Sequence, residues 1–200
     1  MTEPASGCGL TPGPLMKTFE LIAGNRRSIY AYLPTPVPRE IISWAISVAG
    51  LAPNHYKTKP WRFIVFTGSG RDKLADAYQR AAIRLGRDVA KARDRALAAP
   101  AMIAVACVPQ IANPKVKPLE EQFATAAAVQ NLMLALAAAE VSSIWTTGEL
   151  VDSEELRNAA GLALGDKVLG VIYAGLRDPS RPVPARAAME ASDVTTWCTA

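Results

Sequence analysis

The nine residues from Pro53 to Trp61 (PNHYKTKPW) place hydrogen-bonding and cationic side chains between two apolar segments. An apolar pattern with helical spacing ends just before them, and the β-branched and aromatic run RFIVFT follows them. A polar, proline-containing loop between a helix and a buried strand is a common way to lay side chains across a planar ligand. We therefore interpret this loop as one wall of a ligand site.

A second group of potential ligand-binding residues, Arg26, Arg27 and Ser28, follows a predicted helix. The planar fork of an arginine guanidinium meets phosphate oxygens in pairs, and a serine hydroxyl adds a further donor. Basic residues also commonly stand at the C-terminal end of a helix for purely structural reasons. Taken alone, the triplet is compatible with a phosphate site and with a simple helix end.

His55 is the single histidine of the chain. One imidazole without cysteine or carboxylate neighbours at ligand spacing does not indicate a metal site. In isolation a structural or surface role is the simpler interpretation, whereas within this loop a hydrogen bond to a ligand is plausible. The sequence therefore predicts no metal.

Motifs for hydrolysis and phosphoryl transfer are absent. The sequence contains no GxSxG, no Walker loop, no GxGxxG after a strand, and no second histidine for a Ser-His-Asp arrangement. We therefore expect any chemistry to belong to a cofactor.

The composition fits one domain. The chain has 200 residues, half of them apolar, which suffices for one ordinary core. Its net charge of +4 is too small and too scattered for a nucleic-acid protein, although it favours anionic ligands. Cys107 lies in an apolar run, and Cys8 and Cys198 lie in polar termini, so we expect a reduced, cytoplasmic protein.

Neither of two segments has the pattern of a targeting or membrane element. Residues 1–15 lack a basic region followed by an apolar stretch, so they do not form a secretory signal. The apolar segment 123–145 contains Gln130, Asn131 and Glu140, which would be costly in lipid. We expect no membrane span.

Hydrophobic periodicity and helix-boundary residues predict an α+β fold, a sheet covered by many helices. The continuous apolar run over 102–108 indicates a strand buried on both faces at the centre of the sheet. Trp44 and Trp61 lie in apolar periodic segments, which favours core packing over stacking on a ligand. The predicted helices are 14–25, 39–52, 71–84, 86–98, 118–139 and 154–161, and the predicted strands are 62–67, 102–108 and 167–175.

A family resemblance adds to these patterns. The chain resembles the flavin-dependent nitroreductases, in particular the short bacterial members, over Leu15 to Leu176. Each motif alone is modest, but their order and approximate spacing are specific. The motifs are RRS at 26–28, PVPREII, APNHYKTKPWRFIVF, IWTTG and KVLGVIYAGL.

The resemblance implies a nitroreductase-like fold with a central, mostly antiparallel sheet surrounded by helices. It also implies a homodimer formed through long helices, with two FMN molecules in the interface and NAD(P)H as co-substrate. The implied domain covers 15–176, after a flexible tail over 1–14 and before an extension over 177–200 that wraps the core or the partner subunit. The implied flavin-binding residues are Arg26, Arg27, Ser28, Asn54, His55, Lys57, Lys59, Trp145, Thr146, Thr147, Gly148 and Arg186.

The chain departs from the family pattern at three places. Tyr30 and Ala31 stand where a further arginine is usual, Lys59 stands where glutamine is usual, and Thr146 and Thr147 stand in place of Arg-Ser. A cation near the pyrimidine end of a flavin would stabilise the anionic reduced ring and raise its potential. Lys59 equally fits a side chain that points into solvent.

Three functions follow from the resemblance. The first is ping-pong hydride transfer from NAD(P)H through flavin N5 to a nitroaromatic, a quinone or a similar small acceptor, with no catalytic protein residue. The second is a flavin-dependent dehydrogenase or desaturase of a small metabolite with oxygen as acceptor. The third is a flavin-binding protein without turnover.

Overall fold

The computed structural model describes residues 13–110 and 112–198, and its centre is a four-stranded sheet. The strands are β1 (Trp61–Thr67), β2 (Ala101–Cys107), β3 (Ser142–Thr146) and β4 (Lys167–Gly175). Their order is β1-β2-β4-β3, and each neighbouring pair is antiparallel. Every residue of β2 is buried, which confirms the prediction of a central strand covered on both faces.

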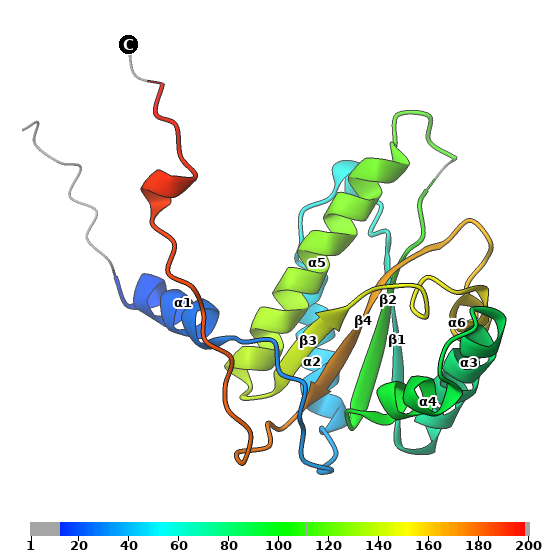
Figure 1. Ribbon diagram of the computed structural model, residues 1–200. Coiled ribbons are helices and arrows are strands. Elements are labelled where there is room, and N and C mark those ends of the chain that lie inside the picture. Colours follow the sequence, from blue (N-terminus) through cyan, green and yellow to red (C-terminus); the bar gives the residue numbers. More distant parts are fainter. Residues whose placement is uncertain (1–12, 111, 199–200) are drawn as a thin grey trace, which may run out of the picture.

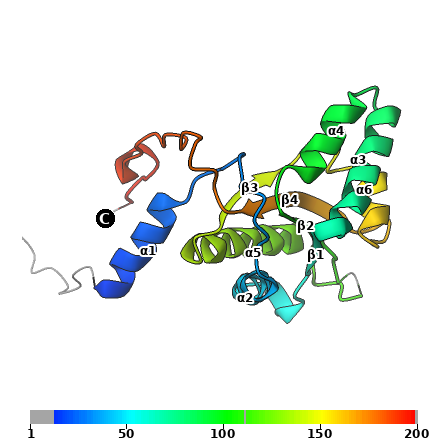
Figure 2. The same ribbon diagram turned by 90° about the horizontal axis from the view of Figure 1, so that it is seen from below.

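Helices cover both faces of the sheet, as Figures 1 and 2 show. The helices α2 (Arg39–Ala49) and α5 (Pro118–Ala138) lie on one face. The helices α3 (Arg71–Arg84), α4 (Val89–Leu97) and α6 (Glu154–Ala159) lie on the other. The alternation of β2 explains the two layers, because Ile103 and Val105 pack toward α2 and α5 while Met102 and Ala104 pack toward α3 and α4.

The long helix α5 has a sequence suited to its place. Pro118 occupies its first turn, where a missing N–H costs nothing, and Glu120 and Glu121 follow where negative charge favours the helix dipole. Its alanines, among them Ala124 and Ala128, allow close packing against α2.

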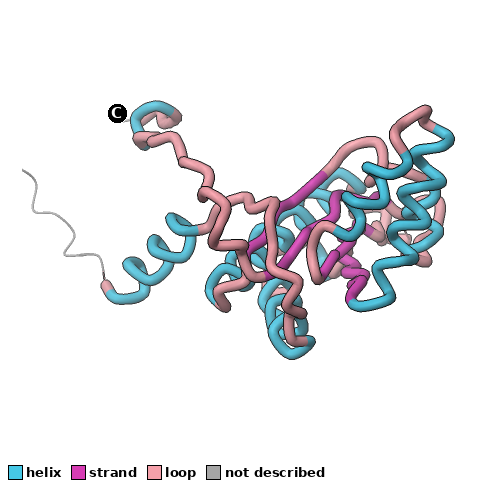
Figure 3. The backbone as a smooth tube through the Cα atoms, turned by 60° about the horizontal axis from the view of Figure 1, so that its bottom comes forward, coloured by secondary structure: helices cyan, strands magenta, loops and turns pink. Residues whose placement is uncertain are grey.

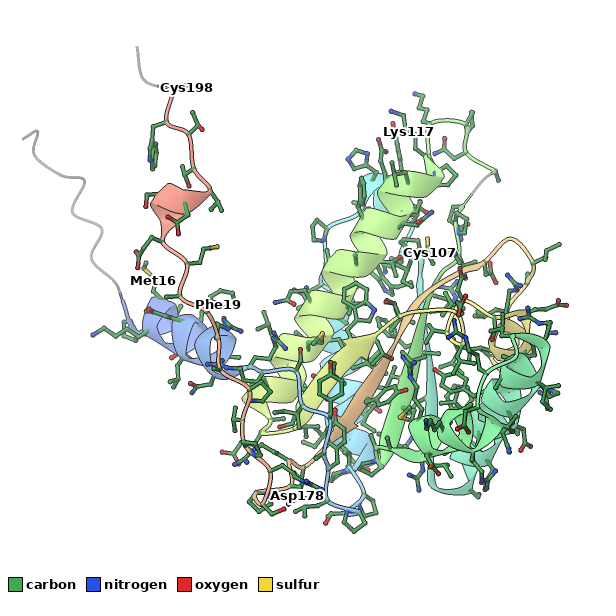
Figure 4. All side chains as sticks on the ribbon, viewed as in Figure 1. Met16, Phe19, Cys107, Lys117, Asp178 and Cys198 are labelled. Carbon is green, nitrogen blue, oxygen red and sulfur yellow. The ribbon has the colours of Figure 1, made fainter. Side chains whose placement is uncertain are left out.

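The helix α1 (Pro14–Asn25) and the C-terminal segment after β4 stand out from the sheet and its covering helices (Figures 1 and 3). No residue of α1 is buried, and Leu15 and Phe19 are 85% and 61% exposed. Figure 4 shows Met16 and Phe19 on this helix, away from the sheet. The predicted helical bounds are confirmed, but among residues 13–110 and 112–198 nothing covers the apolar stripe.

Trp44 and the strand β3 differ from what the sequence predicts. Trp61 is buried, as predicted, but Trp44 is 46% exposed, so the prediction of core packing for Trp44 was wrong. The indole lies on the outer side of α2, whose inner side presents Ile42 and Ala45 to the core. The edge strand β3 was not predicted as a strand, because its serines and threonine break the apolar pattern.

The sequence also predicts that the chain has no membrane span and no metal site. None of the helices in the described ranges is both long and apolar enough to cross a bilayer. Within the same ranges, no cluster of His, Cys, Asp and Glu side chains has the arrangement of a metal site. Cys8 and most of the predicted tail over 1–14 lie outside the described residues.

Candidate functional site

A pocket rich in arginine lies where the end of α1 meets the start of β3. We call it the arginine pocket. Arg26 and Arg27 enter it from the end of α1, Ser142 and Ser143 from β3, and Arg177 from the segment after β4. Residues at the end of α5 and the turn after it, together with parts of α1 and the C-terminal segment, complete its wall: Leu21, Ile22, Asn25, Ile29, Ala137, Ala138, Glu140, Val141 and Val183.

Two polar groups in this pocket lack partners. Within residues 13–110 and 112–198, three buried side-chain polar atoms have no hydrogen-bond partner, and two of them are Arg26 Nη1 and Ser143 Oγ. Burial lowers the pKa of the Arg26 guanidinium, and the positive charges of Arg186 and Arg27 lower it further. Buried polar groups are normally paired. The pocket therefore has the donors and the surplus positive charge that suit an anion such as phosphate.

Arg27 and Arg186, the two arginines whose charges act on Arg26, make structural hydrogen bonds. Arg27 Nε donates to the Pro184 carbonyl at 3.2 Å, and its Nη1 donates to the carbonyls of Gly24 and Arg26. Arg186 donates to the Ala23 carbonyl at 3.2 Å and to the Arg26 carbonyl at 2.9 Å. The carbonyls of Ala23, Gly24 and Arg26 belong to the end of α1, where helix acceptors lack internal partners, whereas that of Pro184 belongs to the C-terminal segment. Arg27 and Arg186 therefore join α1 to the C-terminal segment while adding charge beside Arg26.

Ser28 joins the arginine pocket to β3. It forms an isolated parallel bridge with Ser143, and the N–H of Ile29 donates to the Ser143 carbonyl at 3.4 Å. Ser28 is half-buried beside this contact. The structure thus brings the predicted residues 26–28 together with a serine that the sequence interpretation did not single out.

The predicted segment Trp145–Gly148 leads away from that contact along β3. The Trp145 indole donates to the Leu169 carbonyl at 3.0 Å, and the Thr146 hydroxyl donates to the Val171 carbonyl at 3.0 Å. The Thr147 carbonyl accepts from Arg95 at 3.2 Å. Gly148 has φ +113°, in the left-handed region that favours glycine. These bonds fix the backbone of the segment and leave Thr147 and Gly148 exposed.

A second pocket contains the predicted loop. We call it the histidine pocket. His55 Nδ1 lies 3.2 Å from Glu120 Oε2, and the N–H of Lys59 donates to Asn54 Oδ1 at 3.0 Å. The side chains of Lys57 and Lys59 are exposed. The pocket is lined by Pro53, Asn54, His55, Glu120, Phe123, Ala124 and Ala127.

The two pockets lie at opposite ends of α5. Ala127 lines the histidine pocket and Ala137 lines the arginine pocket. Their separation corresponds to about 15 Å along the axis at the usual helical rise. The structure therefore does not bring Arg26, Arg27 and Ser28 together with His55 within one chain.

Comparison with known proteins decides the family. The family model described as "Nitroreductase family" matches residues 23–176. The chain belongs to the nitroreductase family. Membership makes the chain an enzyme of the nitroreductase type. The matched range contains every predicted site residue except Arg186, which lies beyond it.

One relative and two solved structures show how far the likeness to other nitroreductases extends. The Escherichia coli K12 protein named "Putative NAD(P)H nitroreductase YdjA" is 31% identical over 80% of this chain and 88% of its own length. A nitroreductase-like family protein from Bacillus cereus has a TM-score of 0.78 and 24% identity, over 99% of this chain and 98% of its own. The FMN-dependent nitroreductase NfnB from Mycobacterium smegmatis, solved with NADPH, has a TM-score of 0.71 and 21% identity, over 92% of this chain and 100% of its own. The two structures establish the nitroreductase-like fold.

Sequence reasoning missed three residues of the nitroreductase pockets. Ser143 and Arg177 line the arginine pocket, and Glu120 pairs with His55. Ser143 directly precedes the IWTTG motif. Its closeness to the predicted site could be inferred from the sequence, but its burial could not. Glu120 stands in the first turn of α5, where the helix dipole already accounts for an acidic residue.

Proposed function

We propose that this protein is an FMN-dependent oxidoreductase that oxidises NAD(P)H and reduces a small acceptor such as a nitroaromatic or a quinone. The observation that carries the proposal is the pair of unpartnered buried atoms, Arg26 Nη1 and Ser143 Oγ, in one cationic pocket. The names of the relatives agree with it, since YdjA is called an NAD(P)H nitroreductase and NfnB is called FMN-dependent. The cytoplasm, where NAD(P)H is available, is the proposed location.

The arginine pocket fits the phosphate of FMN. Arg26 would donate to the phosphate, which would restore the partner that its buried Nη1 lacks and relieve the repulsion from Arg27 and Arg186. Arg27 and Arg186 would contribute charge while keeping their hydrogen bonds to the end of α1. The backbone around Ser28, held against Ser143, would then place the ring beside β3.

Bound FMN supplies the acceptance and donation of hydride, so the protein needs no nucleophile. The residues of this chain bind the group, orient it and set its electrostatic surroundings. Trp145, Thr146, Thr147 and Gly148 are proposed to line the ring, on a backbone fixed by the bonds to Leu169 and Arg95. Asn54, His55, Lys57 and Lys59 are proposed to approach the ring of the partner subunit, where Lys59 would favour the reduced anion.

We also propose a homodimer that forms both flavin sites. A helix of 12 residues such as α1 is marginal in water, and its exposed Leu15 and Phe19 call for a covering surface. Phe123 on α5 is likewise 62% exposed beside the histidine pocket. A twofold arrangement that sets the histidine pocket of one subunit against the arginine pocket of the other would cover these side chains and complete each site.

The absorption spectrum of the purified protein tests the cofactor. We expect a flavin band with close to one FMN per subunit. Colourless protein that takes up no added FMN would overturn the proposal.

Anaerobic stopped flow then tests the reaction. Bleaching of the flavin by NADPH or NADH, followed by reoxidation with a quinone or a nitroaromatic, is the expected result. Bleaching by small metabolites but by neither nicotinamide cofactor would indicate the dehydrogenase or desaturase function instead. A flavin that no donor reduces would indicate a binding protein without turnover.

A further inference from the structure

The loop from Pro53 to Pro60 has an unusual backbone. Tyr56, Lys57 and Lys59 have φ values of 53°, 54° and 50°. In the described ranges only one other non-glycine residue, Glu140, has a positive φ. Side chains other than glycine rarely adopt this region, and each such residue costs on the order of 1–2 kcal/mol. A loop that contains three of them needs specific contacts to hold it.

One such contact is a buried carboxylate in the first turn of α5. Glu121 is 1% exposed, and its Oε1 accepts a hydrogen bond of 2.6 Å from the Thr58 hydroxyl. Its Oε2 accepts from the N–H of Gln110 at 3.3 Å. A carboxylate is buried only where hydrogen bonds compensate for lost water, and bonds to a charged group are the stronger kind. Thr58 therefore has a strong and well-placed partner on the rigid helix.

The hydroxyl of Thr58 lies in the middle of the unusual segment. Thr58 follows Lys57 and precedes Lys59, which are two of the three loop residues with positive φ. The Lys59 N–H is held in turn by Asn54 Oδ1 at 3.0 Å, and the Lys59 carbonyl accepts from Arg62 at 3.3 Å. The side chains of His55, Lys57 and Lys59 are exposed to solvent. The hydrogen bond from Thr58 to Glu121 anchors the loop to α5.

We propose that Glu121 is a positioning residue that, through Thr58, holds the Pro53–Pro60 loop in the conformation that presents His55, Lys57 and Lys59 to the flavin of the partner subunit. The flavin part of this inference rests on the proposed function. The anchoring of the loop by Glu121 does not, so it can be tested in protein without FMN.

The test uses two substitutions of Thr58, one substitution of Glu121 and a matched control at Thr125. Thr58→Val removes the hydroxyl and keeps the shape, whereas Thr58→Ser keeps the hydroxyl. Thr125→Val is the control, because Thr125 is a buried threonine of α5, the helix that carries Glu121. Its hydroxyl donates at 2.8 Å to the backbone carbonyl of Glu121 and not to the loop. Glu121→Gln is the second approach, since it leaves Thr58 only a neutral, weaker acceptor and turns an N–H donor toward the N–H of Gln110.

The first readout is the imidazole signal of His55 in FMN-free protein. Because the chain has a single histidine, its NMR resonance reports on this loop without ambiguity, provided that no affinity tag remains. Thr58→Val should shift and broaden the resonance, and Glu121→Gln should change it in the same sense. Thr58→Ser and Thr125→Val should resemble the wild type.

The second readout is FMN affinity and the flavin midpoint potential. We expect Thr58→Val to weaken FMN binding about ten-fold and to shift the potential, and Thr58→Ser to restore both. An unchanged His55 resonance in folded Thr58→Val protein would overturn the inference, as would equal effects of Thr58→Val and Thr58→Ser. An altered resonance in protein that binds no FMN would support the anchoring and would count against the proposed function alone.

Discussion

The guanidinium of Arg186 donates a hydrogen bond of 2.9 Å to the carbonyl oxygen of Arg26, 160 residues earlier in the chain. Arg27 donates to the same carbonyl at 3.0 Å. Arg27 and Arg186 are thus engaged with the backbone, whereas Arg26 has a buried donor without a partner. Arg26 and Arg27, which are adjacent in the sequence and of the same type, therefore have different roles.

The first prediction concerns Arg26→Ala. If Arg26 holds the phosphate, the loss of a charge-assisted hydrogen bond should weaken FMN binding about ten- to a hundred-fold, and the remaining affinity should depend less on salt. Fluorescence titration of FMN-free protein measures both. Arg27→Ala is the comparison, with a smaller expected loss because its donors bond to carbonyls. A larger effect of Arg27→Ala would exchange the two roles.

The second prediction concerns Gly170→Ala. A Cβ at Gly170 would lie 1.9 Å from Trp145 Nε1, so the indole must move and lose its bond to the Leu169 carbonyl. We expect about 1–3 kcal/mol of lost stability in urea unfolding and an altered flavin spectrum. Gly165→Ala is the control, since a Cβ there meets nothing within 4 Å. Equal stabilities of the two variants would contradict this packing.

The third prediction concerns Phe123→Glu. A carboxylate at this exposed position should weaken the proposed dimer, because dimer formation would bury the charge in an apolar contact. Sedimentation velocity should show monomer at concentrations where the wild type is dimeric, together with lower FMN content. Leu164→Glu, at an exposed leucine between α6 and β4, should leave both unchanged. A dimeric Phe123→Glu protein would exclude this face from the interface.

The fourth prediction concerns pH. Hydrogen bonds from Arg84 lower the pKa of the Glu155 carboxyl from 4.5 to about 2. The pair therefore stabilises the folded state fully above pH 4.5, and this contribution is lost as the pH falls toward 2. Glu155→Gln should lower Tm by about 1–3 °C at pH 7, since one partner is largely exposed. The difference should shrink by pH 3, and a constant difference would show that the ion pair does not cause it.

The core elements could be predicted because local pattern and burial agree in them. The apolar run of β2 has one solution, a strand covered on both faces, and the bounds of α3 matched those predicted for it. The edge strand β3 could not be predicted, because Ser142 and Ser143 make contacts specific to the arginine pocket. The exposure of Trp44 and of the apolar stripe of α1 could not be predicted for another reason: apolar periodicity shows that a helix face needs cover, but not whether the cover belongs to the same chain.

The candidate site was predictable in its parts. The residues at 26–28 and 53–61 stood out by type, whereas the buried position of Glu121 and the division of labour among the arginines depend on tertiary contacts. Glu121 follows Glu120 directly, and nothing in their types distinguishes the buried carboxylate from the one that pairs with His55.

The separation of Arg26 from His55 along α5 has a genetic consequence. When one subunit supplies Arg26 to a site and the other supplies His55, a chain damaged at Arg26 and a chain damaged at His55 can rescue each other. In the hybrid dimer one site contains both changed residues, and the other site contains an intact Arg26 and an intact His55. A random one-to-one mixture should therefore regain about a quarter of the sites, although neither parent has any intact site.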